Sequence, residues 1–224
     1  MSQTETLMAR DGHVFSAYIA QPAAHARGAV VIAQEIFGLT PHIRRLADSY
    51  AADGYLAVAP ALFDRIRRDL VLGHSPAEVE QARGYRMQID DSKAVLDLAA
   101  AAAMARHSGK VAVIGYCWGG LLAWMAASAG ETPFAAAVSY YGARIGEHLA
   151  KTPSCPSMLH FGERDASIPA AQIERIRSAY PQGIYYLYAA GHGFNNEDRP
   201  ANYDAAAAAL ARSRTNAFLS QHIG

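Results

Sequence analysis

Cysteine, tryptophan and net charge are all scarce in this sequence. It contains two cysteines and two tryptophans, and its 20 Lys and Arg residues balance 20 acidic residues. Two cysteines cannot build a disulfide framework, and the chain has neither the CxxC nor the HExxH spacing typical of metal sites. Without a basic excess it is poorly suited to nucleic acid or to an anionic membrane surface. We therefore expect no metal, no nucleic-acid partner and no membrane partner.

Signals for membrane insertion and export are also missing. One uncharged stretch, from Val111 to Gly130, approaches the length of a membrane span. Glycines at positions 115, 119 and 120 interrupt it, and its β-branched first part gives way to an Ala- and Leu-rich second part. This order predicts a buried strand, a tight turn and a buried helix. The first residues lack the basic, apolar and small-residue order of a signal peptide, so we expect a cytoplasmic protein.

Strand-like and helix-like runs alternate along the whole chain. Hydrophobic residues make up 51% of its 224 residues, which is enough for a large core. Continuous apolar runs such as 28–33 are typical of parallel strands covered on both faces. The alternation predicts an α/β fold with one domain over 1–224, a mostly parallel central sheet and helices on both faces. Strands are expected at 13–20, 28–33, 55–59, 111–116, 134–140, 157–161 and 184–188, and helices from 41, at 76–106, from 118, at 169–179 and at 201–219.

The strongest chemical signal is Gly-Tyr-Cys-Trp-Gly-Gly, which ends at Gly120 and separates an expected strand from an expected helix. It matches the elbow that presents a catalytic nucleophile, with Cys117 where serine is commoner. Glycine is needed beside the nucleophile because the turn is too sharp for larger side chains. The helix N-terminus would favour a thiolate and a developing oxyanion. The alternative is an inert, buried cysteine in a glycine-rich turn.

An elbow of this kind requires an acid and then a histidine, each on a loop after a later strand. Asp165 follows the strand expected at 157–161, and His192 follows the strand expected at 184–188, between two glycines. Glu163 is the rival acid, but Asp165 is preferred because it lies farther beyond the strand end. In this arrangement Asp165 orients His192, which takes the thiol proton and later activates water. The alternative for His192 is a surface-loop histidine without a catalytic role.

These segments, together with Gln-Glu-Ile-Phe-Gly-Leu at 34–39, resemble the dienelactone hydrolase family over about residues 10–220. The resemblance implies the α/β-hydrolase fold and a triad of Cys117, Asp165 and His192. The chain has neither the GxGxxG nor the P-loop pattern, so we expect no cofactor. The resemblance further implies that Glu35 holds the resting thiol until substrate displaces it. The backbone N–H groups of Ile36 and Trp118 are expected to form the oxyanion hole, which agrees with the elbow motif.

The resemblance is weaker at the substrate carboxylate, which members of this family grip with arginines. Arg65 occupies the first expected position, although it is alternatively a solvated surface residue. The second position, four residues after His192, holds Asn196 instead of arginine. Arg199 lies three residues further and takes over this role if the loop folds back. The loss of one guanidinium weakens a preference for an anionic lactone.

Other residues have weaker claims to the site. Phe37, Tyr85 and Tyr141 are expected as apolar walls or else as core residues, and Arg144 is a further candidate for the lining. Cys155 precedes a strand and is expected to pack at the end of the sheet opposite Cys117.

A thiolate is a strong nucleophile and a good leaving group, so it suits esters and lactones better than amides. We expect a monomeric, cysteine-dependent hydrolase acting on a small ester or lactone of dienelactone type. The alternatives are a hydrolase of neutral or bulkier esters, a non-catalytic ligand-binding protein and a thiol-redox protein.

Overall fold

The computed structural model describes residues Met1 to Gly224 and is built on one eight-stranded sheet. Its strands are β1 (Ser2–Met8), β2 (Val14–Ala20), β3 (Ala29–Ala33), β4 (Leu56–Pro60), β5 (Val111–Tyr116), β6 (Ala136–Tyr140), β7 (Ser157–Gly162) and β8 (Ile184–Tyr188). They lie in the order β1-β2-β4-β3-β5-β6-β7-β8. Strands β3 to β8 are mutually parallel, whereas β1 and β2 form antiparallel pairs. The mostly parallel sheet expected from the sequence is confirmed.

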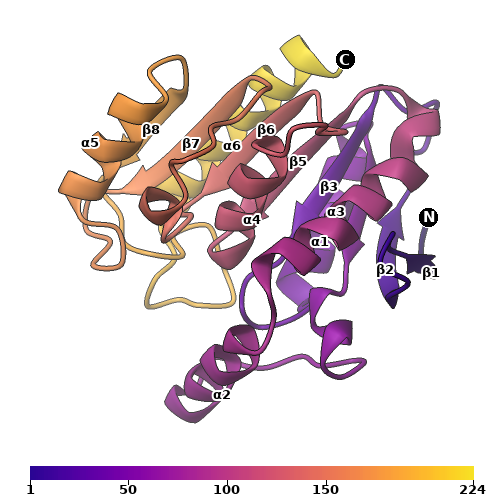
Figure 1. Cartoon of the computed structure of the whole chain (residues 1–224), viewed down its shortest axis with the longest axis horizontal. Helices are drawn as coiled ribbons and strands as arrows, with labels where there is room; N and C mark the ends of the chain where they lie inside the picture. Colours follow the sequence, from indigo (N-terminus) through magenta and orange to yellow (C-terminus); the bar gives the residue numbers. More distant parts are fainter.

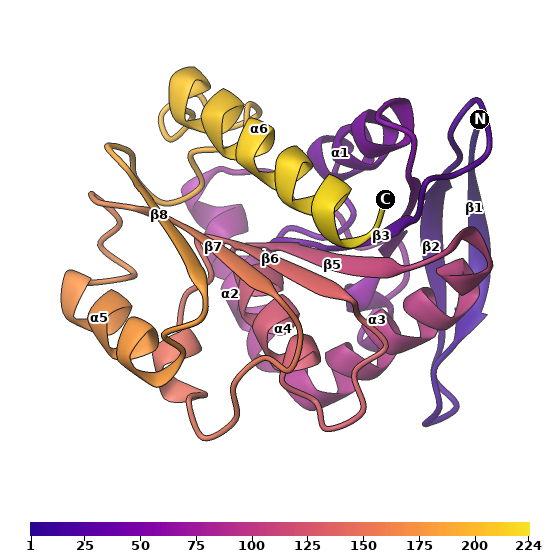
Figure 2. The same cartoon turned by 90° about the horizontal axis from the view of Figure 1, so that it is seen from above.

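Helices cover both faces of this sheet. They are α1 (Pro41–Ala52), α2 (Pro76–Met87), α3 (Asp91–Ala105), α4 (Trp118–Ala127), α5 (Ala170–Ala179) and α6 (Ala205–His222). Figure 2 shows α1 and α6 on one face and α3, α4 and α5 on the other, while Figure 1 shows α2 extending away from the sheet. Hydrophobic clusters of 36 and 26 buried residues lie between these layers, so the sheet is covered on both sides.

Strand β1 was not expected from the sequence. It pairs with β2 along its full length, from Ser2 opposite Ala20 to Met8 opposite Val14. All of its side chains except that of Leu7 are exposed, because β1 is an edge strand. The alternation of buried and exposed residues that identifies a strand in a sequence is therefore missing there.

The helix expected at 76–106 is instead two helices, and the prediction is wrong at this point. The first, α2, ends at Met87 with Gln88 as its C-cap residue. The side chain of Asp90 then caps α3 by accepting a hydrogen bond from the backbone N–H of Ser92 at 2.8 Å. An N-cap inside a run of helix formers stops one helix and starts another.

The remaining boundaries differ by a few residues. Helix α6 begins at Ala205 instead of 201, because the Asp204 side chain accepts the Ala207 N–H and fixes the first turn there. The uncharged stretch from Val111 folds as β5, a turn and α4, as expected. None of the helices has both the length and the apolar character needed to cross a membrane.

Candidate active site

Cys117 occupies a sharp turn between β5 and α4. Its φ of 56° and ψ of −115° lie in a region that non-glycine residues rarely adopt. A Cβ atom on Gly115 would lie 1.8 Å from the Gly119 oxygen, and one on Gly119 would lie 2.1 Å from the Ala33 oxygen. No side chain fits at either position, so both glycines are required for the turn. The elbow expected from the sequence is present.

The turn brings the Cys117 thiol against His192. The His192 Nε2 atom lies 3.1 Å from the Cys117 Sγ atom, and its Nδ1 atom lies 2.7 Å from the Asp165 Oδ2 atom. Asp165 follows β7 and His192 follows β8, so both loops leave the sheet at the carboxyl edge of the parallel strands, where β5 also ends. Three residues that are far apart in the sequence thus form one continuous hydrogen-bonded chain.

The electrostatics of this chain favour a charged imidazole. Burial lowers the pKa of His192, but the charges and hydrogen bonds of Cys117 and Asp165 outweigh burial and raise the pKa to about 10. The Asp165 side chain is fully buried and also accepts the Ser167 N–H at 2.8 Å. These contacts fix the carboxylate toward Nδ1 of His192 and leave Nε2 for the thiol.

Glu163, the rival acid, lies on the outside of the same turn. It is exposed, whereas Asp165 is 4% exposed and contacts the histidine ring. The backbone of His192 is held separately, because the Asn202 side chain donates a hydrogen bond to its carbonyl oxygen at 3.0 Å. Nothing in the sequence pattern around Asn202 indicated this contact.

The backbone N–H groups of Ile36 and Trp118 have no hydrogen-bond acceptor in the structure. The Ile36 N–H lies in the loop after β3, and the Trp118 N–H lies in the first turn of α4. Because Gly119 has no side chain, the start of α4 packs against the carbonyl groups of Ala33 and Gln34. The segments that carry the two N–H groups are therefore neighbours. Unpaired donors of this kind can receive an oxyanion.

Comparison with known proteins assigns the chain to a family. Residues 15–223 match the sequence model described as "Dienelactone hydrolase family". The chain belongs to the dienelactone hydrolase family. A carboxymethylenebutenolidase of Pseudomonas putida is 34% identical, with 96% of this chain and 94% of that protein covered. Carboxymethylenebutenolidase 1 of Cupriavidus pinatubonensis is 32% identical, with 98% and 97% covered.

The fold comparison agrees. A crystal structure from Klebsiella pneumoniae, provisionally described as a dienelactone hydrolase, has a TM-score of 0.82 and 28% identity, and covers 99% of this chain and 100% of that chain. Membership of the dienelactone hydrolase family makes the chain a hydrolase of carboxylic esters or lactones.

Glu35 does not hold the thiol as the family resemblance implied. Its carboxylate is 2% exposed and accepts a hydrogen bond from the Asn196 side chain, with 2.6 Å between Nδ2 and Oε2. Asn196 is fully buried and is therefore a partner of Glu35, not the substrate-contacting residue expected from the sequence. The thiol of Cys117 is hydrogen-bonded to His192 instead. Two buried polar groups thus satisfy each other, and a role for either residue during substrate binding stays a prediction.

Arg65 is not free to bind a substrate carboxylate. Its guanidinium donates two hydrogen bonds of 2.7 Å to Asp97 and further ones to Asp11 at 3.0 and 3.4 Å. The Asp97 side chain is fully buried, and burial raises the pKa of Asp97 to about 6 although Arg65 opposes this. Two carboxylates therefore accept hydrogen bonds from Arg65, which forms a structural ion pair with the buried Asp97, and a contact with substrate stays a prediction.

Arg199 has no carboxylate partner. Its guanidinium carbon lies 5.4 Å from the centre of the Phe37 ring, and the His74 ring lies nearly perpendicular to the same ring, with 4.5 Å between ring centres. A Cβ atom on Gly193, next to His192, would lie 3.4 Å from Nη1 of Arg199. The loop after β8 thus brings the Arg199 guanidinium near Gly193, the residue that follows His192, and substrate binding by Arg199 stays a prediction. Arg144, in contrast, faces solvent and pairs with Glu147.

The expected aromatic residues occupy different depths around the site. Phe37 and Tyr141 are buried, and the Tyr141 ring lies edge-on to His192 at 5.1 Å. The Tyr141 hydroxyl is buried without a hydrogen-bond partner. Tyr85 lies farther out on α2 and packs against Phe63, with 6.4 Å between ring centres. Tyr141 is thus the aromatic residue that packs against His192. Tyr85 packs against Phe63 instead.

Trp118 is held by residues that the sequence did not single out. Its indole Nε1 donates to Asp91 Oδ1 at 2.7 Å, and Arg86 pairs with Asp91 while its guanidinium lies 5.5 Å from the indole ring. Phe63 also stacks on the indole, with 5.8 Å between ring centres. In the sequence Asp91 resembled an ordinary residue of a helical first turn, so no signal revealed this contact.

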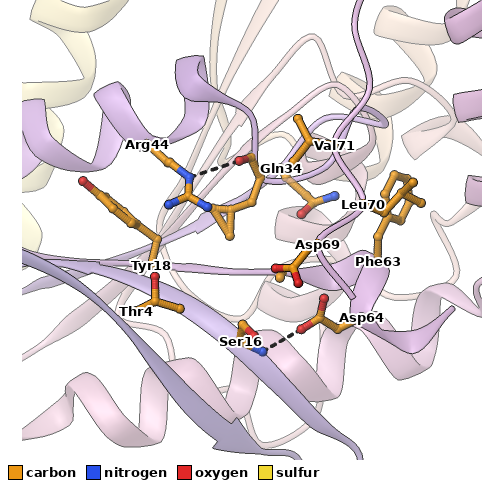
Figure 3. Close-up of a pocket in the computed structure, with 12 residues that line it drawn as sticks. Thr4, Ser16, Tyr18, Gln34, Arg44, Phe63, Asp64, Asp69, Leu70 and Val71 are labelled. Carbon is orange, nitrogen blue, oxygen red and sulfur yellow. Dashed lines mark hydrogen bonds between the residues drawn. The ribbon is translucent and has the colours of Figure 1, made fainter. Parts of the chain in front are cut away.

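A separate pocket is lined partly by β2 and by the segment that follows β4. Its volume is about 150 Å³, and no triad residue lines it. Figure 3 shows the carboxylate of Asp64 accepting the backbone N–H of Ser16, at 2.8 Å, with Arg44 on the opposite wall. The buried Gln34 also lines this pocket and accepts the Leu62 N–H at 3.2 Å. This contact anchors the start of the loop that carries Glu35 and Ile36.

Cys155 lies far from the triad in the topology. It is buried just before β7 begins, whereas Cys117 follows the carboxyl end of β5. Parallel strands place these two positions at opposite edges of the sheet, and burial raises the pKa of the Cys155 thiol. Cys155 is therefore a core residue that cannot pair with Cys117.

Proposed function

We propose that the chain hydrolyses small carboxylic esters or lactones through a thioester on Cys117. The observation that carries this proposal is the hydrogen-bonded chain from Sγ through His192 to Asp165, located at the elbow. The thiol proton passes to Nε2 of His192, whose charged form the site favours, and Sγ then bonds to the substrate carbonyl carbon. The carbonyl oxygen becomes an oxyanion, for which the N–H groups of Ile36 and Trp118 are the free donors.

Collapse of this intermediate breaks the ester C–O bond. The departing oxygen takes the proton from Nε2, which leaves the acyl group on Sγ; in a lactone the ring opens and the hydroxyl stays attached to the acyl group. A water molecule then gives a proton to Nε2 and attacks the thioester carbon. The C–S bond breaks, Sγ recovers the proton, and the acid product leaves. Asp165 holds the imidazole of His192 in the same orientation during acylation and during hydrolysis of the thioester.

The substrate class that best fits is a small unsaturated lactone with a carboxylate, of the carboxymethylenebutenolide type. The names of the relatives support it, and Arg199 supplies a cation beside His192 without a competing acid. The planar face of Phe37 and the ring of Tyr141 suit a flat, conjugated ring.

A second candidate is a neutral ester. It is favoured by one observation, that Arg65 and Asn196 are both engaged with buried carboxylates and leave Arg199 as the one cation for the substrate. Loss of a bidentate arginine contact reduces the preference for an anion but leaves the chemistry of the thiol intact.

The kinetic test compares wild type and Cys117→Ala on a dienelactone and on 4-nitrophenyl acetate. We expect the dienelactone to have the higher kcat/KM and the variant to be inactive on both. Turnover of the neutral ester alone would favour the second candidate. An active Cys117→Ala enzyme would refute the thioester route for either substrate.

A further inference from the structure

Glu35 depends on a single donor. Asn196 is the only residue whose side chain donates a hydrogen bond to the Glu35 carboxylate, and both residues are almost completely buried. The orientation of the amide is fixed independently, because its Oδ1 atom accepts the backbone N–H of Asp198 at 3.0 Å. With the oxygen occupied by that N–H group, the Nδ2 group must face the carboxylate.

The other groups that face Glu35 do not replace this donor. His42, on α1, is buried with an unpartnered Nε2 atom, and burial lowers its pKa. His74, on the segment before α2, also has a pKa lowered by burial and by the charge of Arg199. Tyr141, after β6, has a pKa raised well above its usual range by burial and by Glu35 and Cys117. All three are uncharged near pH 7, so Arg199 is the nearby cation and Asn196 the hydrogen-bond donor.

We propose that Asn196 is a positioning residue that holds Glu35 away from Cys117, so that the thiol is paired with His192 before any substrate binds. Two contacts carry this inference: the 2.6 Å hydrogen bond from Asn196 to Glu35, and the 3.1 Å contact between Sγ of Cys117 and Nε2 of His192. The thiol proton then passes to Nε2, and the proton on Nδ1 remains in the hydrogen bond to Asp165. Without its donor, Glu35 is free to accept the thiol proton instead.

This assignment deepens the proposed function, on which it rests, by separating activation of the thiol from recognition of the substrate. A carboxylate on the substrate is not needed to form the reactive pair. Arg199 contributes to binding alone, so neutral esters and anionic lactones meet the same activated thiol and differ in KM.

The test measures the rate at which iodoacetamide alkylates Cys117 without substrate, from pH 5.5 to 9, followed by mass spectrometry of the Cys117 peptide. Asn196→Asp is the matched variant, because Asp keeps the acceptor for the Asp198 N–H and replaces the neutral amide donor with a carboxyl group that competes with Glu35 for a proton. We expect wild type to be alkylated readily at pH 7 and Asn196→Asp about tenfold more slowly. In the double variant Glu35→Gln, Asn196→Asp, the donor and the acceptor are exchanged: the amide introduced at position 35 donates to the carboxylate introduced at position 196. We expect this variant to be alkylated at the wild-type rate.

Two further samples keep the result interpretable. Cys117→Ala reports any alkylation of Cys155, and Asn196→Ala repeats the loss of the donor without adding a carboxylate. Circular dichroism melting confirms that each variant is folded. The proposal is overturned if wild type is alkylated only when a substrate analogue is added, or if both folded Asn196 variants match the wild-type rate and pH profile. These measurements involve no turnover, so failure of the thioester route would appear separately, as hydrolysis by Cys117→Ala.

Discussion

The indole of Trp118 donates a hydrogen bond to Asp91, with 2.7 Å between Nε1 and Oδ1. This contact joins the first turn of α3 to the first turn of α4, 27 residues later in the chain. The backbone N–H of Trp118, the residue that follows Cys117, has no acceptor in the structure. A side chain on one helix thus fixes the residue that supplies a proposed oxyanion donor on another.

Replacing Asp91 with alanine is expected to lower kcat more than it changes KM. The indole and Arg86 both lose their acceptor, so we expect a loss of about 2 kcal/mol in unfolding free energy. Displacement of the Trp118 N–H is expected to reduce kcat roughly tenfold. Thermal melting and steady-state kinetics measure both effects. Glu80→Ala, which removes an exposed ion pair with Arg83, is the control and should change neither quantity. An unchanged kcat in Asp91→Ala would show that the indole contact does not support the donor.

Asp165→Asn tests the choice between the two acids of the turn after β7. The amide cannot stabilise the imidazolium and permits the wrong tautomer, so we expect kcat to fall roughly 10³- to 10⁴-fold with the fold intact. Glu163→Gln, two residues away and exposed, should retain wild-type kinetics. The reverse pattern, a severe loss in Glu163→Gln alone, would assign the role to the other acid.

Arg199→Met tests anion recognition. Methionine keeps an unbranched side chain next to Phe37 but removes the guanidinium that lies over the ring. We expect the ratio of kcat/KM for an anionic lactone to that for 4-nitrophenyl acetate to fall roughly tenfold, as expected for one charge-assisted hydrogen bond. Arg144→Met is the matched control, because Arg144 faces solvent and pairs with Glu147. A ratio that is unchanged in Arg199→Met would place substrate-anion recognition elsewhere.

The burial of His160 predicts how the free energy of unfolding depends on pH. His160 is fully buried between the Tyr188 hydroxyl at 2.8 Å and the Thr215 hydroxyl at 3.1 Å, and burial, with the charge of Arg214, lowers its pKa to about 3. The folded-state pKa lies below the unfolded value near 6.5, so the neutral ring stabilises the fold above about pH 6.5. This contribution is lost as the pH falls toward 3.

Urea unfolding at pH 7, 6, 5 and 4 measures the effect. We expect the unfolding free energy of wild type to decrease across this range, and the slope to be shallower in His160→Gln. The variant will be less stable at pH 7 because it loses packing and hydrogen bonds. The comparison therefore uses the slope of unfolding free energy against pH, not the absolute free energy. Parallel slopes would mean that other groups dominate the acid sensitivity.

The sequence predicts the framework of the site better than its side-chain pairings. Strand order and the glycine pattern predict where Cys117, Asp165 and His192 lie, because parallel strands end at a common edge and Gly119 has no room for a side chain. They do not predict that Asn196 pairs with Glu35, which lies 161 residues earlier. No periodic pattern relates two buried polar groups at that separation.

Contacts between distant segments also explain the other differences between the sequence predictions and the structure. Arg65 occupies the position expected for a substrate contact, but Asp97 lies within reach only after α3 packs beside the sheet. Strand β1 was not predicted because an edge strand need not alternate buried and exposed residues. Local pattern indicates elements and turns, whereas partners of charged side chains depend on packing between distant elements.

Direct detection of the acyl-enzyme tests the central claim. Wild type is mixed with 4-nitrophenyl acetate, quenched in acid within milliseconds, digested and analysed by mass spectrometry. The account predicts one acetyl group on the peptide that contains Cys117, and none on that peptide in Cys117→Ala. Replacing His192 with alanine removes the group that activates water for the second step. The account predicts that the acetyl group then stays on Cys117 for longer than in wild type. Hydrolysis by wild type with no acetyl group on Cys117 at any quench time, together with an active Cys117→Ala enzyme, would contradict the account.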